Sequence, residues 1–297
     1  MSAQFSSKHH YIPKFLIKKF ADEKGKVWVY NKEKKRFDKD PKSPAGVFYE
    51  LNRNTFDLNG TTSDIIEKRY SKIETMLSPV LTRVLQSQTL NGTDLTWLIY
   101  LASLMKWRVP AQDDGVRKML RSIDVQALGL KIVPEDKKLT ATQQQLDEIN
   151  QLDIVIELKR LLLTVQPLTE EAVIEDLFDN SFICNHHNQP ALIGDTMLIE
   201  EAVSDKLGNF ILPLSCDKTL ICNNGISKTV PNEYFTAWKD IAVFHMSEKL
   251  VACRNKAHLQ NVIEHYKMLE QMGKTHLVQE IVFRLLDPDA LEDILKL

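Results

Sequence analysis

The sequence lacks the residue patterns on which many enzyme and metal-binding families depend. Its four cysteines, Cys184, Cys216, Cys222 and Cys253, form no C-x-x-C pair, so neither a zinc ribbon nor a disulfide framework is expected. Patterns of phosphate-binding loops, dinucleotide-binding folds, zinc proteases, serine hydrolases and zinc deaminases are also absent. We therefore expect reduced, packed thiols and no cofactor.

Long hydrophobic runs are missing as well. No run reaches the roughly 18 apolar residues of a membrane helix, and the polar N-terminal stretch has no signal-peptide core. With 43% hydrophobic and 26% charged residues, the 297-residue chain has the composition of an ordinary globular protein. We expect a cytoplasmic protein without a membrane partner.

The net charge of −2 is unevenly distributed along the chain. Residues 1–54 hold 13 Lys and Arg against 6 Asp and Glu, so the remainder is acidic. A basic N-terminal part fits contact with a polyanion such as nucleic acid. A solvated, lysine-rich hairpin explains the same charge without a ligand, and both interpretations stay open.

Apolar spacing predicts a mainly helical α+β fold with a small mixed or antiparallel sheet. The sheet is expected from short alternating runs at 26–37 and about 181–223. Helices are expected at about 12–20, 61–86, 94–107, 152–163, 170–178, 232–245, 256–272, 275–286 and 288–297. We expect one domain over 1–297, in four parts: a basic motif and hairpin (1–60), a helical part (61–180), a β-rich part (181–230) and C-terminal helices (231–297).

The most unusual stretch is residues 8–20, which read KHHYIPKFLIKKF. Pro13 suits the first position of a helix, and the following apolar residues have helical spacing. His10 and Tyr11 would then lie at a helix N-terminus, where unpaired N–H groups and the helix dipole favour an anion. The imidazole of His9 or His10 would be placed to transfer a proton there.

Three charged residues of the predicted helices join these candidates. Arg108 continues the apolar face of the helix at 94–107, so its guanidinium needs either an internal carboxylate or an anion in a cleft. Glu67 and Glu74 share one edge of the helix at 61–86 but lie about 10 Å apart along its axis, too far to ligate one ion together.

Residues 8–20 resemble the N-terminal H-H-Y-[IV]-P-x-F signature of domain-of-unknown-function family 4238, a bacterial and phage family. Weaker similarity continues at 27–30, 48–49, 66–74, 108–110 and 213–215, so the resemblance covers most of the chain. One segment departs from the family pattern F-[IV]-[TS]-S-D-x-P, because residues 182–190 read FICNHHNQP. The acidic residue of that pattern is absent, and no role for it is carried over.

A metal site is not expected. His9-His10 and His186-His187 could supply nitrogen ligands, but adjacent histidines in an extended segment point to opposite faces. Metal sites usually add a carboxylate, and the matching family position lacks one here. We therefore interpret His186 and His187 as loop or capping residues.

Two functional hypotheses remain. In the first, the protein is a phosphodiesterase or nuclease acting on nucleic acid or a nucleotide. His10 would be the general acid or base and Arg108 the phosphate clamp, and the resemblance places such an enzyme in a phage-defence or toxin-like setting. In the second, the same residues hold an anion or a protein partner without chemistry, which a Glu74–Arg108 ion pair would favour. A homo-oligomer is compatible with either hypothesis.

Overall fold

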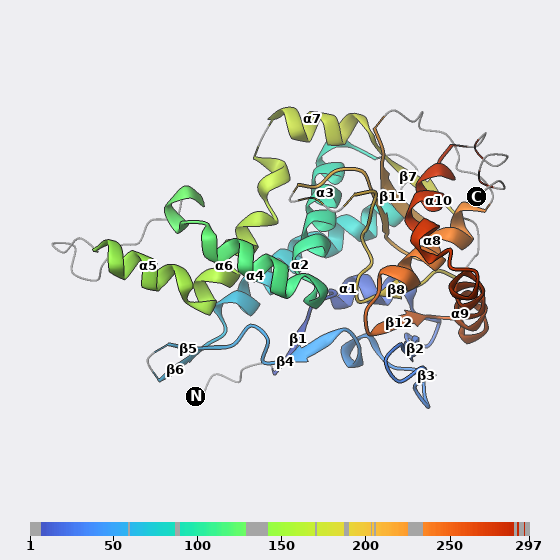
Figure 1. Ribbon diagram of the computed structural model, residues 1–297, viewed down its shortest axis with the longest axis horizontal. Helices are drawn as coiled ribbons and strands as arrows, with labels where there is room; N and C mark the ends of the chain where they lie inside the picture. Colours follow the sequence, from blue (N-terminus) through green and yellow to red (C-terminus); the bar gives the residue numbers. More distant parts are fainter. Residues whose placement is uncertain are drawn as a thin grey trace.

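Helix α3 (Gly92–Trp107) lies at the centre of the molecule and is apolar on all sides (Figure 1). A helix without a polar face is stable only when its whole circumference is covered. Its N-terminus is capped by Asn91, whose side-chain oxygen accepts a hydrogen bond from the Asp94 N–H at 2.8 Å. The other elements pack around this buried helix.

The computed structural model describes residues 7–58, 60–86, 90–128, 142–169, 171–186, 190–202, 204, 206–224, 234–287, 290 and 294. Within these ranges, no helix is both long enough and apolar enough to cross a membrane. His187 lies outside the described residues. So does the predicted helix at 288–297, apart from positions 290 and 294.

The described elements confirm a mainly helical α+β fold in which the small sheets are antiparallel. The further helices are α1 (Lys14–Ile17), α2 (Ile65–Gln86), α4 (Asp113–Ser122), α5 (Gln143–Gln151), α6 (Asp153–Leu163), α7 (Glu171–Asp179), α8 (Phe235–Met246), α9 (Lys256–Gln271) and α10 (Val278–Arg284). The strands are β1 (Lys8–His10), β2 (Trp28–Asn31), β3 (Arg36–Phe37), β4 (Tyr49–Leu51), β5 (Phe56–Leu58), β6 (Thr61–Ser63), β7 (Ser181–Asn185), β8 (Ile193–Gly194), β9 (Ile199–Glu200), β10 (Phe210–Pro213), β11 (Lys218–Cys222) and β12 (Leu250–Cys253).

The two predicted β regions form separate sheets rather than one. The first sheet has the order β7-β11-β10-β9, and the second has the order β3-β2-β12-β8. The N-terminal hairpin therefore meets the β-rich part only through β8, with β12 between them. Strand β12 was not predicted, because the spacing of apolar residues in a four-residue run cannot distinguish a strand from a helix.

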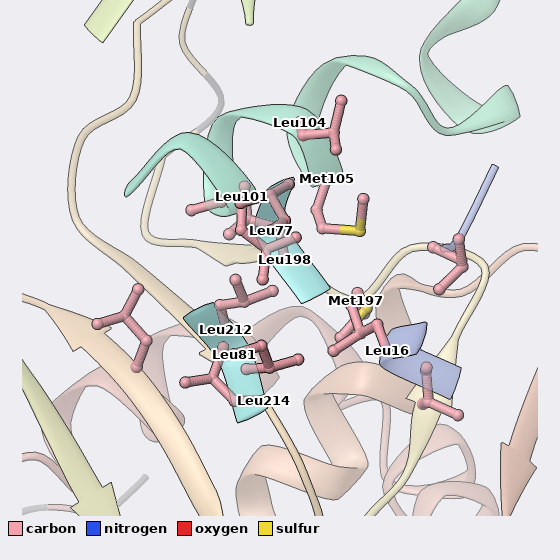
Figure 2. Packing of buried hydrophobic residues seen from close by; sticks show 14 of the residues in the cluster. Leu16, Leu77, Leu81, Leu101, Leu104, Met105, Met197, Leu198, Leu212 and Leu214 are labelled. Atoms are coloured by element: carbon pink, nitrogen blue, oxygen red, sulfur yellow. The ribbon is translucent and has the colours of Figure 1, made fainter. Parts of the chain in front are cut away.

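The first sheet separates two hydrophobic cores. Side chains alternate along each strand, so Phe210 and Leu212 of β10 face the core that contains α3, whereas Ile211 faces the core that contains α8–α10. Figure 2 shows the α3-side core, where leucine and methionine side chains from α1, α2, α3 and β10 interdigitate.

Helices α4, α5 and α6 form a helical arm, on the left of Figure 1, that packs on the α2–α3 core. Its own small core contains Val116, Leu120, Ile156 and Leu163. Helix α5 lies outside the helices expected from apolar spacing. Its Thr142 forms a capping box with Gln145, a local signal that identifies a helix start without an apolar stripe.

We predict that Gly194→Ala destabilises the protein by about 1–3 kcal/mol, because overpacking forces neighbouring atoms to move. A methyl group at this position of β8 would overlap the Ser247 hydroxyl and lie 3.3 Å from the Thr196 carbonyl oxygen. Urea unfolding of the two proteins measures the difference. Gly208→Ala is the control, since no described atom lies within 4 Å of its added methyl group, and equal losses in both variants would contradict the prediction.

Candidate functional site

The first half of the N-terminal motif forms a strand, not a helix N-terminus. Strand β1 pairs antiparallel with β4, with His9 opposite Glu50 and His10 opposite Tyr49. The Tyr11 N–H donates to the Phe48 carbonyl at 3.0 Å, and α1 begins only at Lys14. The predicted placement of His10 and Tyr11 at a helix N-terminus is therefore wrong, because both residues pair with the segment at 48–49. An anion site near them stays a prediction.

His9 is completely buried and has a structural connection to α2. Its Nδ1 accepts a hydrogen bond from the Asn54 N–H at 2.8 Å, which places the ring hydrogen on Nε2. The Asn54 side chain donates in turn to Glu67 at 2.9 Å. His9 and Glu67 thus meet through Asn54, and their own separation of 4.0 Å is not an ion pair in this tautomer.

His10 is buried as well, but on the other side of the strand. Its ring lies 5.6 Å from that of Tyr49, and its Nε2 has no hydrogen-bond partner among the described residues. Burial, followed by the charges of Lys14 and Arg108, lowers the pKa of His10 from 6.5 to about 4. His10 is therefore a neutral imidazole at pH 7, and it lies within electrostatic reach of Arg108.

Arg108 follows the end of α3 and is 2% exposed. Its Nη1 donates to Glu74 at 2.7 Å, and its guanidinium lies over the Tyr70 ring at 4.2 Å. The internal carboxylate that the sequence analysis anticipated is therefore Glu74. The Nε and Nη2 atoms of Arg108 have no hydrogen-bond partner in the part of the chain that the structure describes.

Arg160 of α6 repeats this arrangement. It is 1% exposed, and its Nη1 donates to Asp113 at 2.6 Å. Its Nε and Nη2, like the Tyr70 hydroxyl, lack a hydrogen-bond partner within the described ranges. Burial raises the pKa of Tyr70 to about 12, and the charges of both arginines act on this phenol. We call Tyr70, Arg108 and Arg160 the arginine centre.

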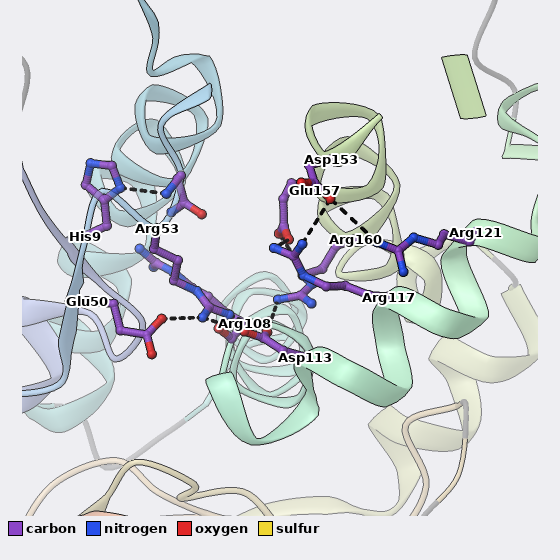
Figure 3. A network of polar contacts seen from close by, with 11 residues as sticks. His9, Glu50, Arg53, Arg108, Asp113, Arg117, Arg121, Asp153, Glu157 and Arg160 are labelled. Carbon is purple, nitrogen blue, oxygen red and sulfur yellow. Dashed lines mark hydrogen bonds and ion pairs between the residues drawn. The ribbon is translucent and has the colours of Figure 1, made fainter. Parts of the chain in front are cut away.

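A network of ion pairs connects Arg160 of the arginine centre to Glu50 of β4, the strand that pairs with the motif strand β1 (Figure 3). Arg53 donates hydrogen bonds to Glu50 at 2.6 Å and to Asp113 at 2.7 Å. Asp113 also accepts a hydrogen bond from Arg160. Burial alone would lower the pKa of Arg53, but hydrogen bonds and the charges of Asp113 and Glu50 raise it. Burial alone would raise the pKa of Asp113, but Arg53 and Arg160 lower it. The network therefore stabilises the charged form of each group.

Tyr11 lines a pocket with a volume of about 210 Å³, which we call the motif pocket. Its lining brings together the motif, the β2–β3 hairpin, β4, the residues after α3, and the start of β12. The lining residues are Tyr11, Asn31, Glu33, Tyr49, Glu50, Pro110, Ala111, Asp195, Glu248, Lys249 and Leu250. The six predicted residues therefore lie in three places. Tyr11 lines the pocket, and His10, Arg108 and Glu74 lie at or near the arginine centre. His9 and Glu67 both contact Asn54.

The second histidine pair and the cysteines have a different environment. His186 bonds to the Thr219 hydroxyl at 2.8 Å, and burial lowers its pKa to about 4. Burial raises the pKa of Cys184 and Cys222 to about 11, so both stay thiols. Among the described residues, no three His, Cys, Asp or Glu side chains are grouped closely enough to hold a metal ion.

The sequence analysis missed Arg53, Asp113 and Arg160. Arg160 carries the same signal that identified Arg108, because it follows Ile156 by four residues and precedes Leu163 by three, on the apolar stripe of α6. Arg53 and Asp113 lie in a turn and at a helix start, where no periodicity marks a buried position.

We predict that acidification destabilises the protein through His10. Because the folded-state pKa of about 4 lies below the unfolded value of 6.5, the unfolded state binds more protons between these values, and stability is lost as the pH falls. In His10→Gln, the loss of unfolding free energy between pH 7 and pH 4.5 should shrink by about 2–3 kcal/mol. Urea unfolding at both pH values measures it.

A pH dependence that is the same in His10→Gln and the wild type would show that His10 titrates normally.

The comparisons with known proteins identify a family. A family model described as protein of unknown function (DUF4238) matches residues 8–261. The chain belongs to this family, as the motif at residues 8–20 led us to expect. Neither a curated protein nor a solved structure matches the chain.

Proposed function

We propose that this member of the DUF4238 family binds a small oxyanion of the phosphate class at the arginine centre. The supporting observation is that the Nε and Nη2 atoms of Arg108 and the Nη2 atom of Arg160 lack hydrogen-bond partners among the described residues, whereas the Arg160 Nε lies 3.5 Å from a Glu157 carboxylate oxygen. Nε and Nη2 together form the side-on edge of a guanidinium, which binds two oxygens of a phosphate or carboxylate at once.

Energetics favour a ligand at this edge. Leaving a buried polar group without a hydrogen bond costs about 1–3 kcal/mol, and more when the group is charged. Among the described residues, the arginine centre contains three guanidinium nitrogens without a hydrogen bond or ion pair and the Tyr70 hydroxyl, all buried. One tetrahedral oxyanion offers enough acceptor oxygens for both guanidinium edges and the phenol.

The surroundings favour a small anion over a nucleic acid strand. Arg108 and Arg160 are almost fully buried, whereas the side chains of their partners Glu74 and Asp113 are 19% and 24% exposed. An approaching polyanion therefore meets carboxylates before it meets a guanidinium, and like charges repel. The Glu74–Arg108 ion pair is also the feature that favours binding over catalysis.

Phosphodiester cleavage is a second candidate function, and His10 is the observation that favours it. A neutral imidazole with an unpaired Nε2 within the described chain can accept a proton from an attacking hydroxyl or water. Arg108 would stabilise the charge that develops on the phosphoryl oxygens. A nuclease or nucleotide phosphodiesterase of this type would suit a phage-defence or toxin-like setting.

We predict that Arg108→Lys weakens binding of inorganic phosphate at least tenfold, because a lysine ammonium cannot reproduce the two-point guanidinium contact. Isothermal titration calorimetry at constant ionic strength measures the affinity. Arg284→Lys, which changes a half-exposed surface arginine, should bind as the wild type does. Equal affinities in Arg108→Lys and the wild type would rule out the proposed site.

A second substitution separates loss of binding from loss of folding. Glu74→Gln removes a negative charge bonded to the Arg108 Nη1, beside the proposed Nε–Nη2 edge. Phosphate should therefore bind several-fold more tightly to this variant, because charge repulsion is reduced, while the unfolding temperature falls. Weaker binding to Glu74→Gln would contradict a repulsive role for the carboxylate.

The cleavage hypothesis predicts a different pattern in His10→Gln. Turnover of bis(4-nitrophenyl) phosphate should fall about 10²–10⁴-fold, the usual contribution of a general base, while phosphate affinity changes less than threefold. Absorbance of released 4-nitrophenolate, with affinity from calorimetry, measures both. If the wild type shows no turnover above buffer, or if His10→Gln keeps it, the cleavage hypothesis fails and the binding function is unaffected.

A further inference from the structure

The motif pocket has the opposite charge to the arginine centre. Four carboxylates line it, those of Glu33, Glu50, Asp195 and Glu248, against the single lining cation Lys249. Glu50 is paired with Arg53, but Glu33 and Glu248 have no ion-pair partner in the described part of the chain. The residues that line the pocket therefore carry a surplus of negative charge.

Asp195 fixes the geometry of one wall. Its Oδ1 accepts a hydrogen bond from the Glu248 N–H at 2.9 Å, and its Oδ2 accepts from the N–H groups of Lys249 and Leu250 at 2.7 and 2.8 Å. These bonds hold the turn before β12 against the loop after β8. Burial raises the pKa of Asp195, although the three N–H donors and the charge of Lys32 act in the opposite direction. Loss of hydration therefore outweighs these stabilising contacts.

Tyr11 provides a second and independent observation. Its side chain is 5% exposed and lines the pocket, yet its hydroxyl has no hydrogen-bond partner among the residues described. Burial and the charges of Asp195 and Glu50 raise the pKa of Tyr11, so the phenol stays neutral and its oxygen can accept a hydrogen bond. A polar group on an almost fully buried side chain usually has a hydrogen-bond partner, so this hydroxyl is available to a ligand in the pocket.

The aromatic rings also suit a cation. Tyr11 and Tyr49 both border the pocket, and the electron-rich faces of such rings attract ammonium groups. Tyr49 already shows this behaviour, since the Lys8 ammonium nitrogen lies 4.5 Å from its ring centroid. Carboxylates, a phenol oxygen and aromatic faces are together the complement of an alkylammonium group.

We propose that the motif pocket binds the ammonium end of a small alkylamine. A bare metal ion fits less well, because the described residues contain no group of three His, Cys, Asp or Glu suited to a metal and two walls are aromatic. The volume of about 210 Å³ is below the roughly 300–1,000 Å³ of pockets for drug-sized ligands, which limits the ligand to one short chain. This site is independent of the proposed phosphate site.

The test uses 1,5-diaminopentane as the probe and 1,5-pentanediol as its neutral analogue. Calorimetric titration of the full chain at low ionic strength should show saturable binding of the diamine and none of the diol. The double variant Glu33→Gln/Glu248→Gln should bind the diamine at least tenfold more weakly, because it removes two exposed carboxylates without changing their shape. Tyr11→Phe should weaken binding about threefold to tenfold through the lost acceptor.

Two controls make the outcome decisive. Glu23→Gln/Glu264→Gln removes two exposed carboxylates that do not line the pocket, and it should bind the diamine as the wild type does. Phosphate affinity should be unchanged in the pocket variants, so failure here leaves the oxyanion proposal intact. Absent binding, binding of the diol with equal affinity, or equal losses in both double variants would overturn the ammonium site.

Discussion

The buried charge of Arg108 is the constraint on which the arrangement around the motif depends. Helix α3 is apolar around its circumference, so the guanidinium at its end cannot reach water and must be neutralised by protein groups. Glu74 of α2 supplies the carboxylate, and the Tyr70 ring supplies the stacking surface. Because both partners belong to α2, compensation of one charge also fixes how α2 packs against α3.

Other buried or partly buried arginines near Arg108 are also neutralised by carboxylates, so that positive and negative side chains alternate. Asp113 bridges Arg53, which follows β4, and Arg160 of the helical arm, while Arg160 and Arg117 both contact Glu157. Breaking a buried pair by removing one partner leaves an uncompensated charge, which costs about 3–5 kcal/mol. The network therefore couples the strand that carries the motif to the helical arm, and changes at its members should not be additive.

Sequence periodicity located most helices and the buried position of Arg108, because both depend on local spacing. It failed where pairing between distant segments decides the structure. Residues 8–10 have no intrinsic signal for a strand, and they form one because residues 49–51 lie beside them. Similarly, β12 exists because β2 and β8 flank it. The partner of Arg108 could be inferred as a carboxylate from electrostatics, whereas the convergence of Arg160 on Tyr70 depends on the packing of α6, which local spacing does not encode.

Strand geometry also explains why two adjacent histidines have different properties. Successive side chains of a strand point to opposite faces, so His9 meets Asn54 and α2, whereas His10 meets Tyr49 and the field of Arg108. In addition to burial, the positive charge of Arg108 lowers the pKa of His10. An oxyanion bound to Arg108 would offset part of that charge and would therefore raise the pKa of His10. Anion binding and protonation of His10 would then favour each other, because coupling between two sites is reciprocal. Because the charge of Arg108 acts on His10, the charge state of His10 would report whether the arginine centre is occupied.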